Sequence, residues 1–426
     1  MNKKILLVVL ILLVLCAVLV FLGLRQDTVP AGSDGGEEVQ SVQQQEEIPE
    51  PITATLAVCG DIMSHSPQTN DAYDAATDTY SYLPCFQYVK PWIEGADYAV
   101  ANFETTLNGP PYSGYPQFCA PDALAYDIKT IGFDLVTTAN NHAMDKGFNG
   151  VVRTLDTLDQ AGLAHVGGYR TQEEYDQSKG VVLADVGGIS VAFLGYTYGT
   201  NGIPIAAEND FCLNRFNTDY MDTCSTMDQE KLKAELDYAQ SLEPDLIAVM
   251  IHWGIEYQTT QNEYQTQVAD FLIANGADLI LGSHSHVPQP METRTVTLED
   301  GSPRSAFVSY SLGNFVSNQS PATVSVNYTD TTAVLNLELT KDFATGQTTV
   351  TNVSYVPLLV LNRGTGVQDQ YLILDVNAGM ASHDAGDTSV VTDAVYAKLQ
   401  YALEGCHNIL GAEYDTAGSP PTEAAA

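Results

Sequence analysis

The sequence has 426 residues, enough for one large or two ordinary domains, and 45% of them are hydrophobic, as in globular proteins. Its 53 acidic residues outnumber its 17 basic residues, which gives a formal net charge of −36. This excess argues against a nucleic-acid-binding protein, because nucleic acids are bound by basic surfaces. It also argues against broad adhesion to anionic lipid.

The N-terminus has the features of a membrane anchor. After a cytoplasmic stub of residues 1–4, which contains Lys3 and Lys4, an unbroken apolar run covers residues 5–24, long enough to span a bilayer as a helix. Only Arg25 follows the run before the acidic residues, so we expect the N-terminus inside the cell and the main domain outside. A cleaved signal peptide is the alternative, but no Ala-x-Ala pattern closes the run. These features predict a single-pass protein of the cell membrane with an extracellular domain.

Two segments lack the apolar content that folding requires. Residues 25–52, rich in Gly, Ser, Gln, Glu and Pro, are predicted to form a disordered acidic stalk. Residues 413–426, which end in GSPPTEAAA, are predicted to be a disordered tail. Between them we expect a main domain over residues 53–362 and a C-terminal helical extension over residues 363–412.

The cysteines that follow Cys16 have no CxxC spacing, which excludes zinc ribbons and thioredoxin chemistry. Outside the membrane some of them can pair. Cys212 with Cys224 and Cys85 with Cys119 are the local candidates, although connectivity does not follow from sequence alone.

Predicted strands and helices alternate through the main domain. Apolar, β-branched runs predict strands at Thr55–Cys59, Tyr98–Asn102, Leu135–Thr138, Ile189–Leu194, Leu246–Ile251, Leu279–Leu281 and Phe307–Tyr310. Helical periodicity separates several of them, at Gly150–Ala161, Asp228–Leu242 and Tyr264–Asn275. Later come strands at Ala333–Thr340 and Thr348–Leu361 and a final amphipathic helix at Asp393–Leu410. The alternation predicts a layered α/β domain in which mixed sheets pack between helices.

Polar side chains follow five of the predicted strands. In chain order they are Asp61 with His65, Asn102 with Glu104, Asn141 and His142 with Asp145, His252, and His284 with His286. In open α/β sheets, ligands bind at the carboxyl ends of the strands. We therefore expect these carboxylates, amides and imidazoles to surround one crevice.

These side chains are typical ligands of divalent metal ions. Carboxylates, an Asn carbonyl and neutral imidazoles suit Mn²⁺, Fe, Zn²⁺ or Mg²⁺. A carboxylate can bridge two ions roughly 3.5–4 Å apart, and such a pair activates water and binds a phosphoryl group. Each motif alone has a simpler interpretation, such as a turn at Gly60-Asp61, a cap at Glu104 or a half-buried His252. The whole set is more specific and predicts one or two bound ions.

The order GD…NFE…NNH…HWG…GSHSH resembles the calcineurin-like metallophosphoesterase superfamily. The residues within these motifs are similar to those of the CapA/PgsA family of bacterial capsule and poly-γ-glutamate synthesis proteins. The segments Gly167-Gly168 and Ser311–Phe315 support this resemblance. The resemblance covers about Thr53 to Leu361. It implies a four-layer sandwich of two mixed β-sheets flanked by helices. It also implies a metal-dependent hydrolase-type site and a part in envelope-polymer synthesis.

The resemblance further implies two metal positions that share a bridging carboxylate from Glu104. Asp61 and His286 would complete the first position. The second would be completed by Asn141, His252 and His284.

His142 would face the substrate and donate a proton to the leaving oxygen, and Asp145 would orient it. One residue departs from the superfamily, because Met63 stands where an Asp-x-His pattern places a histidine. A thioether is a poor ligand for these ions, so the first position lacks a ligand unless His65 moves in. His65 and Asn102 are extra candidates for metal or substrate contact.

Two functions are compatible with these features. The first is a metal-dependent hydrolase that acts on an anionic envelope polymer or a phosphoester. The second is a non-catalytic metal-binding component of a polymer export or anchoring complex, with membrane synthase or export subunits as partners. A periplasmic-type binding protein without metal would leave the clustered histidines unexplained. We expect membrane contact through the N-terminal helix and no nucleic-acid partner.

Overall fold

The computed structural model describes residues 48–416. The predicted anchor at 5–24, the stalk up to residue 47 and the tail from residue 417 lie outside the described residues. Within residues 48–416, no helix combines the length and apolarity that a membrane crossing requires.

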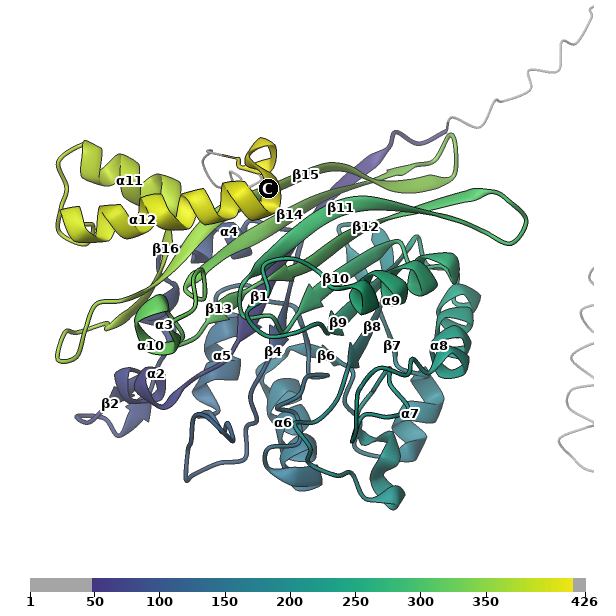
Figure 1. Ribbon diagram of the computed structural model, residues 1–426, viewed down its shortest axis with the longest axis horizontal. Helices are drawn as coiled ribbons and strands as arrows, with labels where there is room; N and C mark the ends of the chain where they lie inside the picture. Colours follow the sequence, from purple (N-terminus) through teal and green to yellow (C-terminus); the bar gives the residue numbers. More distant parts are fainter. Residues whose placement is uncertain (1–47, 417–426) are drawn as a thin grey trace, which may run out of the picture. The chain divides into compact units, whose positions relative to one another are not determined.

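The first sheet has eight strands: β1 (Ile52–Ile62), β4 (Tyr98–Phe103), β5 (Leu135–Thr137), β6 (Ala164–Val166), β13 (Asn314–Val316), β14 (Thr331–Asp342), β15 (Gln347–Asn362) and β16 (Tyr371–Asp375). Seven of them run in the order β16-β15-β14-β1-β4-β5-β6, and β13 pairs with the end of β1 (Figure 1). Strands β1, β4, β5 and β6 are parallel, whereas β14, β15 and β16 are antiparallel. The sheet is therefore mixed, as predicted.

The second sheet has six strands: β7 (Val181–Val186), β8 (Ile189–Thr197), β9 (Leu246–His252), β10 (Leu279–Ser283), β11 (Pro288–Thr297) and β12 (Pro303–Leu312). Their order is β11-β12-β10-β9-β8-β7. The four central strands are parallel, and β7 and β11 are antiparallel edges. The β-branched, apolar character of these strands suits burial on both faces.

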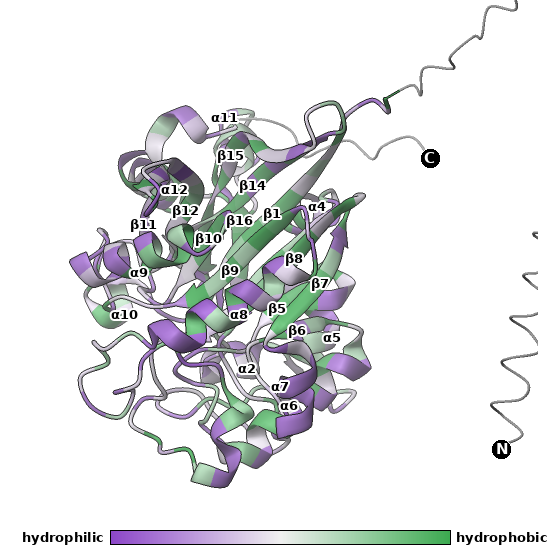
Figure 2. Cartoon of the chain, turned by 90° about the vertical axis from the view of Figure 1, so that its right-hand side faces the viewer, coloured by the Kyte–Doolittle hydropathy of each residue, from purple (hydrophilic) through white to green (hydrophobic). Residues whose placement is uncertain are grey.

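The two sheets pack face to face, and helices cover their other faces. Between the sheets, Leu56 and Val58 of β1 share one buried cluster with Phe193 of β8 and Met250 of β9. The cluster behind the first sheet includes side chains of α3 (Leu83–Phe86), α4 (Lys90–Glu94), α5 (Ala123–Thr130) and α6 (Gly147–Ala161). The cluster behind the second sheet includes side chains of α8 (Gln229–Ser241) and α9 (Glu263–Ala274). In Figure 2 the strands are mostly hydrophobic, whereas polar residues mark the helices that cover them. The predicted α/β class is confirmed.

Shorter elements complete the described chain. They are α2 (Ser66–Asp71), β2 (Tyr73–Asp74), β3 (Thr79–Tyr80), α7 (Gln172–Ser178), the 3-10 helix η1 (Ala207–Cys212), α10 (Pro321–Val324), α11 (Val376–Asp384), α12 (Asp393–Cys406), the π-turn η2 (His407–Gly411) and η3 (Ala412–Tyr414). Residues 363–412 contain β16 as well as α11, α12 and η2, and α11 and α12 share a buried cluster with β15 and β16.

The two suggested disulfides are wrong, because all six cysteines in the described part of the chain are free thiols. The thiol of Cys119 donates to the carbonyl oxygen of Gly109 at 3.3 Å, and that of Cys224 donates to the carbonyl oxygen of Tyr220 at 3.3 Å. Cys212 Sγ lies 3.9 Å from Met144 Sδ. The sequence spacing does not reveal these contacts.

Candidate metal centre

The carboxyl ends of parallel strands from both sheets meet at one crevice. In the first sheet, Asp61 of β1 lies in register with Asn102 of β4. In the second sheet, His252 of β9 lies in register with Ser283 of β10. The loops that follow these strands supply the other candidate residues, so five segments distant in sequence meet at this crevice.

A glycine allows the close approach of β1 and β13 that places Asp61. A Cβ on Gly60 would lie 1.9 Å from the carbonyl oxygen of Gly313, so no other residue fits without a backbone shift. The backbone N–H of Asp61 donates to the same carbonyl at 2.9 Å. The Asp61 carboxylate is thereby fixed at the base of the crevice.

Two overlapping groups of buried side chains present metal-ligating atoms. Within each group, all ligand atoms lie within 4.8 Å of one another. Glu104, His252 and His284 form one group, and Asp61, Glu104 and His286 form the other. Glu104 belongs to both, with Oε1 located 3.5 Å from Nε2 of His252. This is the arrangement that a bridging carboxylate requires.

Asn141 joins the group that contains His252. Its side-chain oxygen Oδ1 lies 3.1 Å from Nε2 of His252, and its Nδ2 donates to Oδ1 of Asn201 at 3.1 Å. The bond to Asn201 fixes the orientation of the amide, so its oxygen points toward the imidazole. Asn201 is exposed and keeps a left-handed φ of 51°.

The donor set fits divalent cations, because two buried atoms in it lack hydrogen-bond partners. These are Oε1 of Glu104 and Nδ1 of His284. A buried polar atom without a partner costs about 1–3 kcal/mol, and a cation bound between the two groups would supply one. His284 also has a φ of 105°, a strained backbone conformation of the kind that accumulates at functional sites.

The charge states of the imidazoles also suit metal binding. Burial, reinforced by the positive charge of His142, lowers the pKa of His252 well below its ordinary value. Burial and the neighbouring His252 likewise lower the pKa of His284, and that of His286 to about 3. All three are therefore neutral, as ligands must be. Burial raises the pKa of Glu104 to about 8, so an ion must displace a proton from this carboxyl at neutral pH.

Partner side chains hold the candidate ligands in place. Nδ1 of His252 lies 2.9 Å from Ser283 Oγ, and Nδ1 of His286 lies 3.0 Å from Asn314 Oδ1. Ligating histidines usually donate their second ring N–H in this way. Asn102 donates its Nδ2 to Oδ1 of Asp61 at 2.7 Å. Its position in the structure is that of a support for Asp61.

His142 and Asp145 form a pair beside the metal groups. Nδ1 of His142 lies 2.8 Å from Oδ2 of Asp145, which also accepts the backbone N–H of Phe118 at 2.6 Å. Burial alone would lower the pKa of His142, but the hydrogen bond to Asp145 and the charges of the surrounding carboxylates outweigh it. The pKa of His142 therefore lies above its ordinary value. The ring is poised to hold a proton toward the cleft.

A cleft of about 320 Å³ opens beside these groups. It is lined by Met63, His65, Tyr115, Phe118, His142, Glu256, Tyr257, His286, Asn318, Gln319, Thr323 and Val324. His65 faces this cleft and belongs to neither metal group. Its Nδ1 accepts the backbone N–H of Asn318 at 3.2 Å. Phe118 packs its ring between those of His65 and His142, with centroids 5.0 and 4.7 Å away.

Sequence reasoning missed several residues that shape the site. Asn314 had a usable signal, because it follows Gly313 at the end of a strand as the candidate ligands do. Tyr198 packs 4.7 Å from the ring of His284, and Asn201 holds Asn141. Both come from the segment Tyr196–Gly202, which the sequence marks only by its glycine and aromatic content. Phe118 ends the segment Pro110–Phe118, which the sequence marks only by its glycine and aromatic content.

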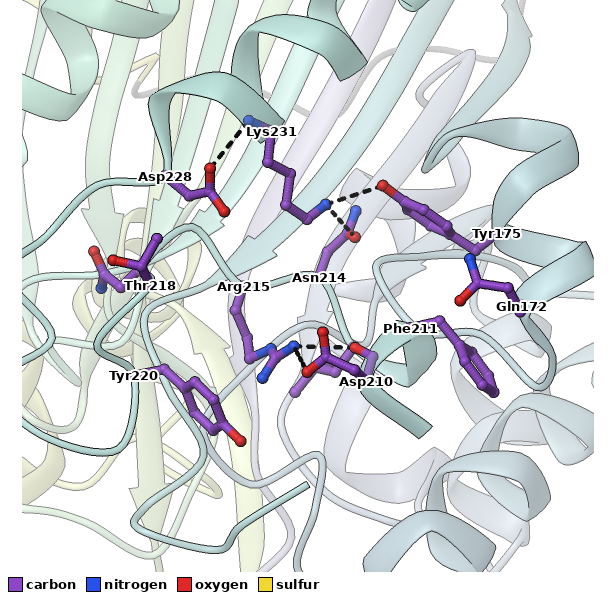
Figure 3. Close-up of a pocket in the computed structure, with 12 residues that line it drawn as sticks. Gln172, Tyr175, Asp210, Phe211, Asn214, Arg215, Thr218, Tyr220, Asp228 and Lys231 are labelled. Atoms are coloured by element: carbon purple, nitrogen blue, oxygen red, sulfur yellow. Dashed lines mark hydrogen bonds and ion pairs between the residues drawn. The ribbon is translucent and has the colours of Figure 1, made fainter. Parts of the chain in front are cut away.

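A second cavity, of about 500 Å³, contains none of the predicted site residues (Figure 3). Its two cations already have carboxylate partners. Arg215 pairs with Asp210 at 2.6 Å, and Lys231 pairs with Glu235. Lys231 also donates to Oδ1 of Asn214 at 3.0 Å. The cavity therefore offers no unpaired cation for an anionic ligand.

The sequence of the main domain matches a known family. Residues 55–319 match the family model described as bacterial capsule synthesis protein PGA_cap. The chain belongs to this family.

Two curated relatives agree with the family match. The capsule biosynthesis protein CapA of Bacillus anthracis is 28% identical over 276 residues, which are 62% of this chain and 60% of the relative. The PGA biosynthesis protein CapA of Bacillus subtilis (strain 168) is 32% identical over 241 residues, 55% of this chain and 57% of the relative. The chain thus spans about 60% of the length of these relatives.

Solved structures give weaker likenesses. A hypothetical protein from Thermus thermophilus aligns with a TM-score of 0.39 and 16% identity, covering 71% of this chain and 98% of that one. The calcineurin-like phosphoesterase YfkN from Bacillus subtilis aligns with a TM-score of 0.38 and 13% identity, covering 82% and 99%. Because both TM-scores are below 0.5, the assignment of the metal centre rests on the side chains of this chain.

Proposed function

We propose that the protein is a metal-dependent hydrolase of the metallophosphoesterase type that takes part in the synthesis or export of capsule or poly-γ-glutamate. The single observation that carries the proposal is the pair of buried ligand groups that share Glu104. Family membership supports the link to envelope polymers. The substrate is an anionic polymer or a phosphoester.

The residues divide the chemistry between them. Asp61, Glu104 and His286 would hold one ion, and Glu104, Asn141, His252 and His284 the other. A bound divalent ion supplies Lewis-acid activation of water and neutralises charge on the attacked group. His142 donates the proton that the leaving oxygen needs, and Asp145 keeps its ring in the required orientation.

Turnover by the purified full-length protein tests the proposal. We expect protein loaded with Mn²⁺ or Zn²⁺ to hydrolyse a phosphodiester or poly-γ-glutamate, and we expect EDTA and His284→Ala each to abolish the activity. Absence of metal-dependent turnover on both substrates would contradict it.

A second function is favoured by Met63, which leaves the first position with three protein ligands. In this alternative the site binds metal without catalysis, as a component of a polymer export or anchoring complex. Normal polymer production in cells carrying Asn141→Ala and His284→Ala, together with loss of production on deletion of residues 5–24, would favour it. The reverse result would support the hydrolase.

The location we propose is the outer side of the cell membrane, with the N-terminal segment as anchor and membrane synthase or export subunits as partners. The support is the order of charge and apolar residues in the first 25 positions. Protease added to intact protoplasts should degrade the main domain. Protection of the domain until the membrane is broken would contradict this orientation.

A further inference from the structure

Glu256 lies in the loop between β9 and α9, on the wall of the cleft. Its Oε1 lies 3.9 Å from Nε2 of His286, and its side chain is 44% exposed. Within residues 48–416, this is the one ion pair that Glu256 makes. The carboxylate approaches a candidate metal ligand from the cleft side, and the division of roles proposed for the hydrolase gives it no part.

The distance suits two side chains that bind the same ion. Metal bonds of about 2.0–2.2 Å place adjacent donors about 3 Å apart and opposite donors about 4 Å apart. The 3.9 Å between Glu256 Oε1 and His286 Nε2 falls within this range. Nε2 is also the nitrogen that His286 has available, because its Nδ1 lies 3.0 Å from Asn314 Oδ1.

The first position is short of both a ligand and negative charge. Met63 is buried and lines the same cleft, but its thioether is a poor ligand for a hard or borderline cation. Asp61 and Glu104 neutralise only half of the charge of two divalent ions. A third carboxylate at this place would improve both the ligand count and the charge balance.

The loop that carries Glu256 is fixed close to the ligands. The backbone N–H of Tyr257 donates to the carbonyl oxygen of Ser285, between His284 and His286, at 2.7 Å. Glu256 itself stands outside the compact group of Asp61, Glu104 and His286. Its half-exposed side chain can reach that group by a change of rotamer, without movement of the loop.

We propose that Glu256 is a further ligand of the first metal ion and replaces the histidine that is absent at Met63. This inference rests on the proposed function, since it requires that the site binds metal. It adds a ligand from a fourth segment of the chain to the first position.

Binding of Mn²⁺ to the full-length protein tests the inference independently of turnover. Titration calorimetry and the exchange-coupled electron paramagnetic resonance signal of paired Mn²⁺ ions would be measured for wild type, Glu256→Gln and Glu256→Asp. Glu263→Gln, an exposed glutamate at the start of the adjacent α9, is the matched control.

We expect two ions per wild-type chain. Glu256→Gln should weaken the affinity for the ion at the first position, which is the weaker of the two, by roughly 10- to 100-fold and remove the paired signal. The ion at the second position should keep its wild-type affinity. Glu256→Asp should retain part of the affinity for the ion at the first position, and the Glu263→Gln control should retain all of it.

Three results would contradict the inference. Two ions with wild-type affinity in Glu256→Gln would overturn it and leave the proposed function standing. A wild type that binds one ion, unaffected by the substitution, would also overturn it. A wild type that binds no ion would overturn both the inference and the proposed function.

Discussion

The two candidate metal positions share Glu104 but differ in how the chain furnishes them. The second position receives Asn141, His252 and His284, and its supports include Ser283 and Asn201. The first receives Asp61 and His286, and the place of a further ligand is taken by Met63. If the proposed function holds, the second position should bind its ion tightly and the first position should bind its ion weakly. A site of this kind can be present in the fold while its full metal loading depends on a single side chain.

Glu104→Gln should have the largest effect, because it removes the charge that both positions share. Each position should lose more Mn²⁺ affinity than the roughly 10–100-fold that loss of an outer-shell partner costs, and turnover should fall to background. The unfolding temperature of the metal-free protein should not fall, since Glu104 is a buried acid whose pKa is raised to about 8. Calorimetric titration and thermal unfolding with and without Mn²⁺ measure these quantities. Retention of either ion at wild-type affinity would break the account of a shared ligand.

His142→Asn should separate catalysis from metal binding. The imidazole that donates the proton is lost, so kcat should fall by about 10²–10³-fold while both ions remain bound. Asp145→Asn should cost less, because it weakens the 2.8 Å contact that orients the ring but leaves the imidazole in place. Steady-state kinetics and elemental analysis of the same samples check this. An equal loss of metal in His142→Asn would show that the residue is a ligand instead.

Met63→His should strengthen the weak position and so reduce the difference between the two. The side chain at position 63 is buried at the cleft, and an imidazole there would add a nitrogen ligand. We expect the ion at the first position to bind on the order of 10-fold more tightly, whereas Met63→Leu should leave its affinity unchanged. If Met63→His has no effect on the titration, the weakness of the first position has another cause.

Asp330 is a buried acid outside the metal groups, and Asp330→Asn should change the stability of the protein. Oδ1 of Asp330 has no hydrogen-bond partner, and burial raises its pKa to about 6. Because the folded-state pKa exceeds the unfolded value, the destabilising effect of the acid grows as the pH rises from about 4 and is fully present above about 6. Asn at this position should therefore raise the free energy of unfolding by about 1–3 kcal/mol at pH 7.5 and by little at pH 4. Denaturant unfolding at both pH values measures this, and an equal gain at both would contradict it.

Much of the fold was accessible from sequence because burial on both faces gives strands such as β9 and β10 continuous apolar runs. The same runs located the site, since Asp61, His252 and His284 follow immediately where the strands end. Sheet order was less accessible. β14 pairs with β1 across more than two hundred residues, and local periodicity carries no information about such partners.

The residues that orient the ligands were harder to predict for the same reason. Asn201, Phe118 and Glu256 lie in loops, and their importance arises only from the contacts that folding creates. Met63 is the opposite case, because its departure from the superfamily pattern was visible in the sequence. The structure adds that this side chain is buried and lines the cleft beside the first metal position.

The metal content of the full-length protein, purified without chelators, tests the central claim most directly. Elemental analysis should find at least one equivalent of Mn, Fe or Zn per chain. The content should fall to near zero in His284→Ala, which removes a ligand of the well-furnished position. Wild-type protein that contains no transition metal and takes up none on incubation with Mn²⁺ or Zn²⁺ would contradict the account.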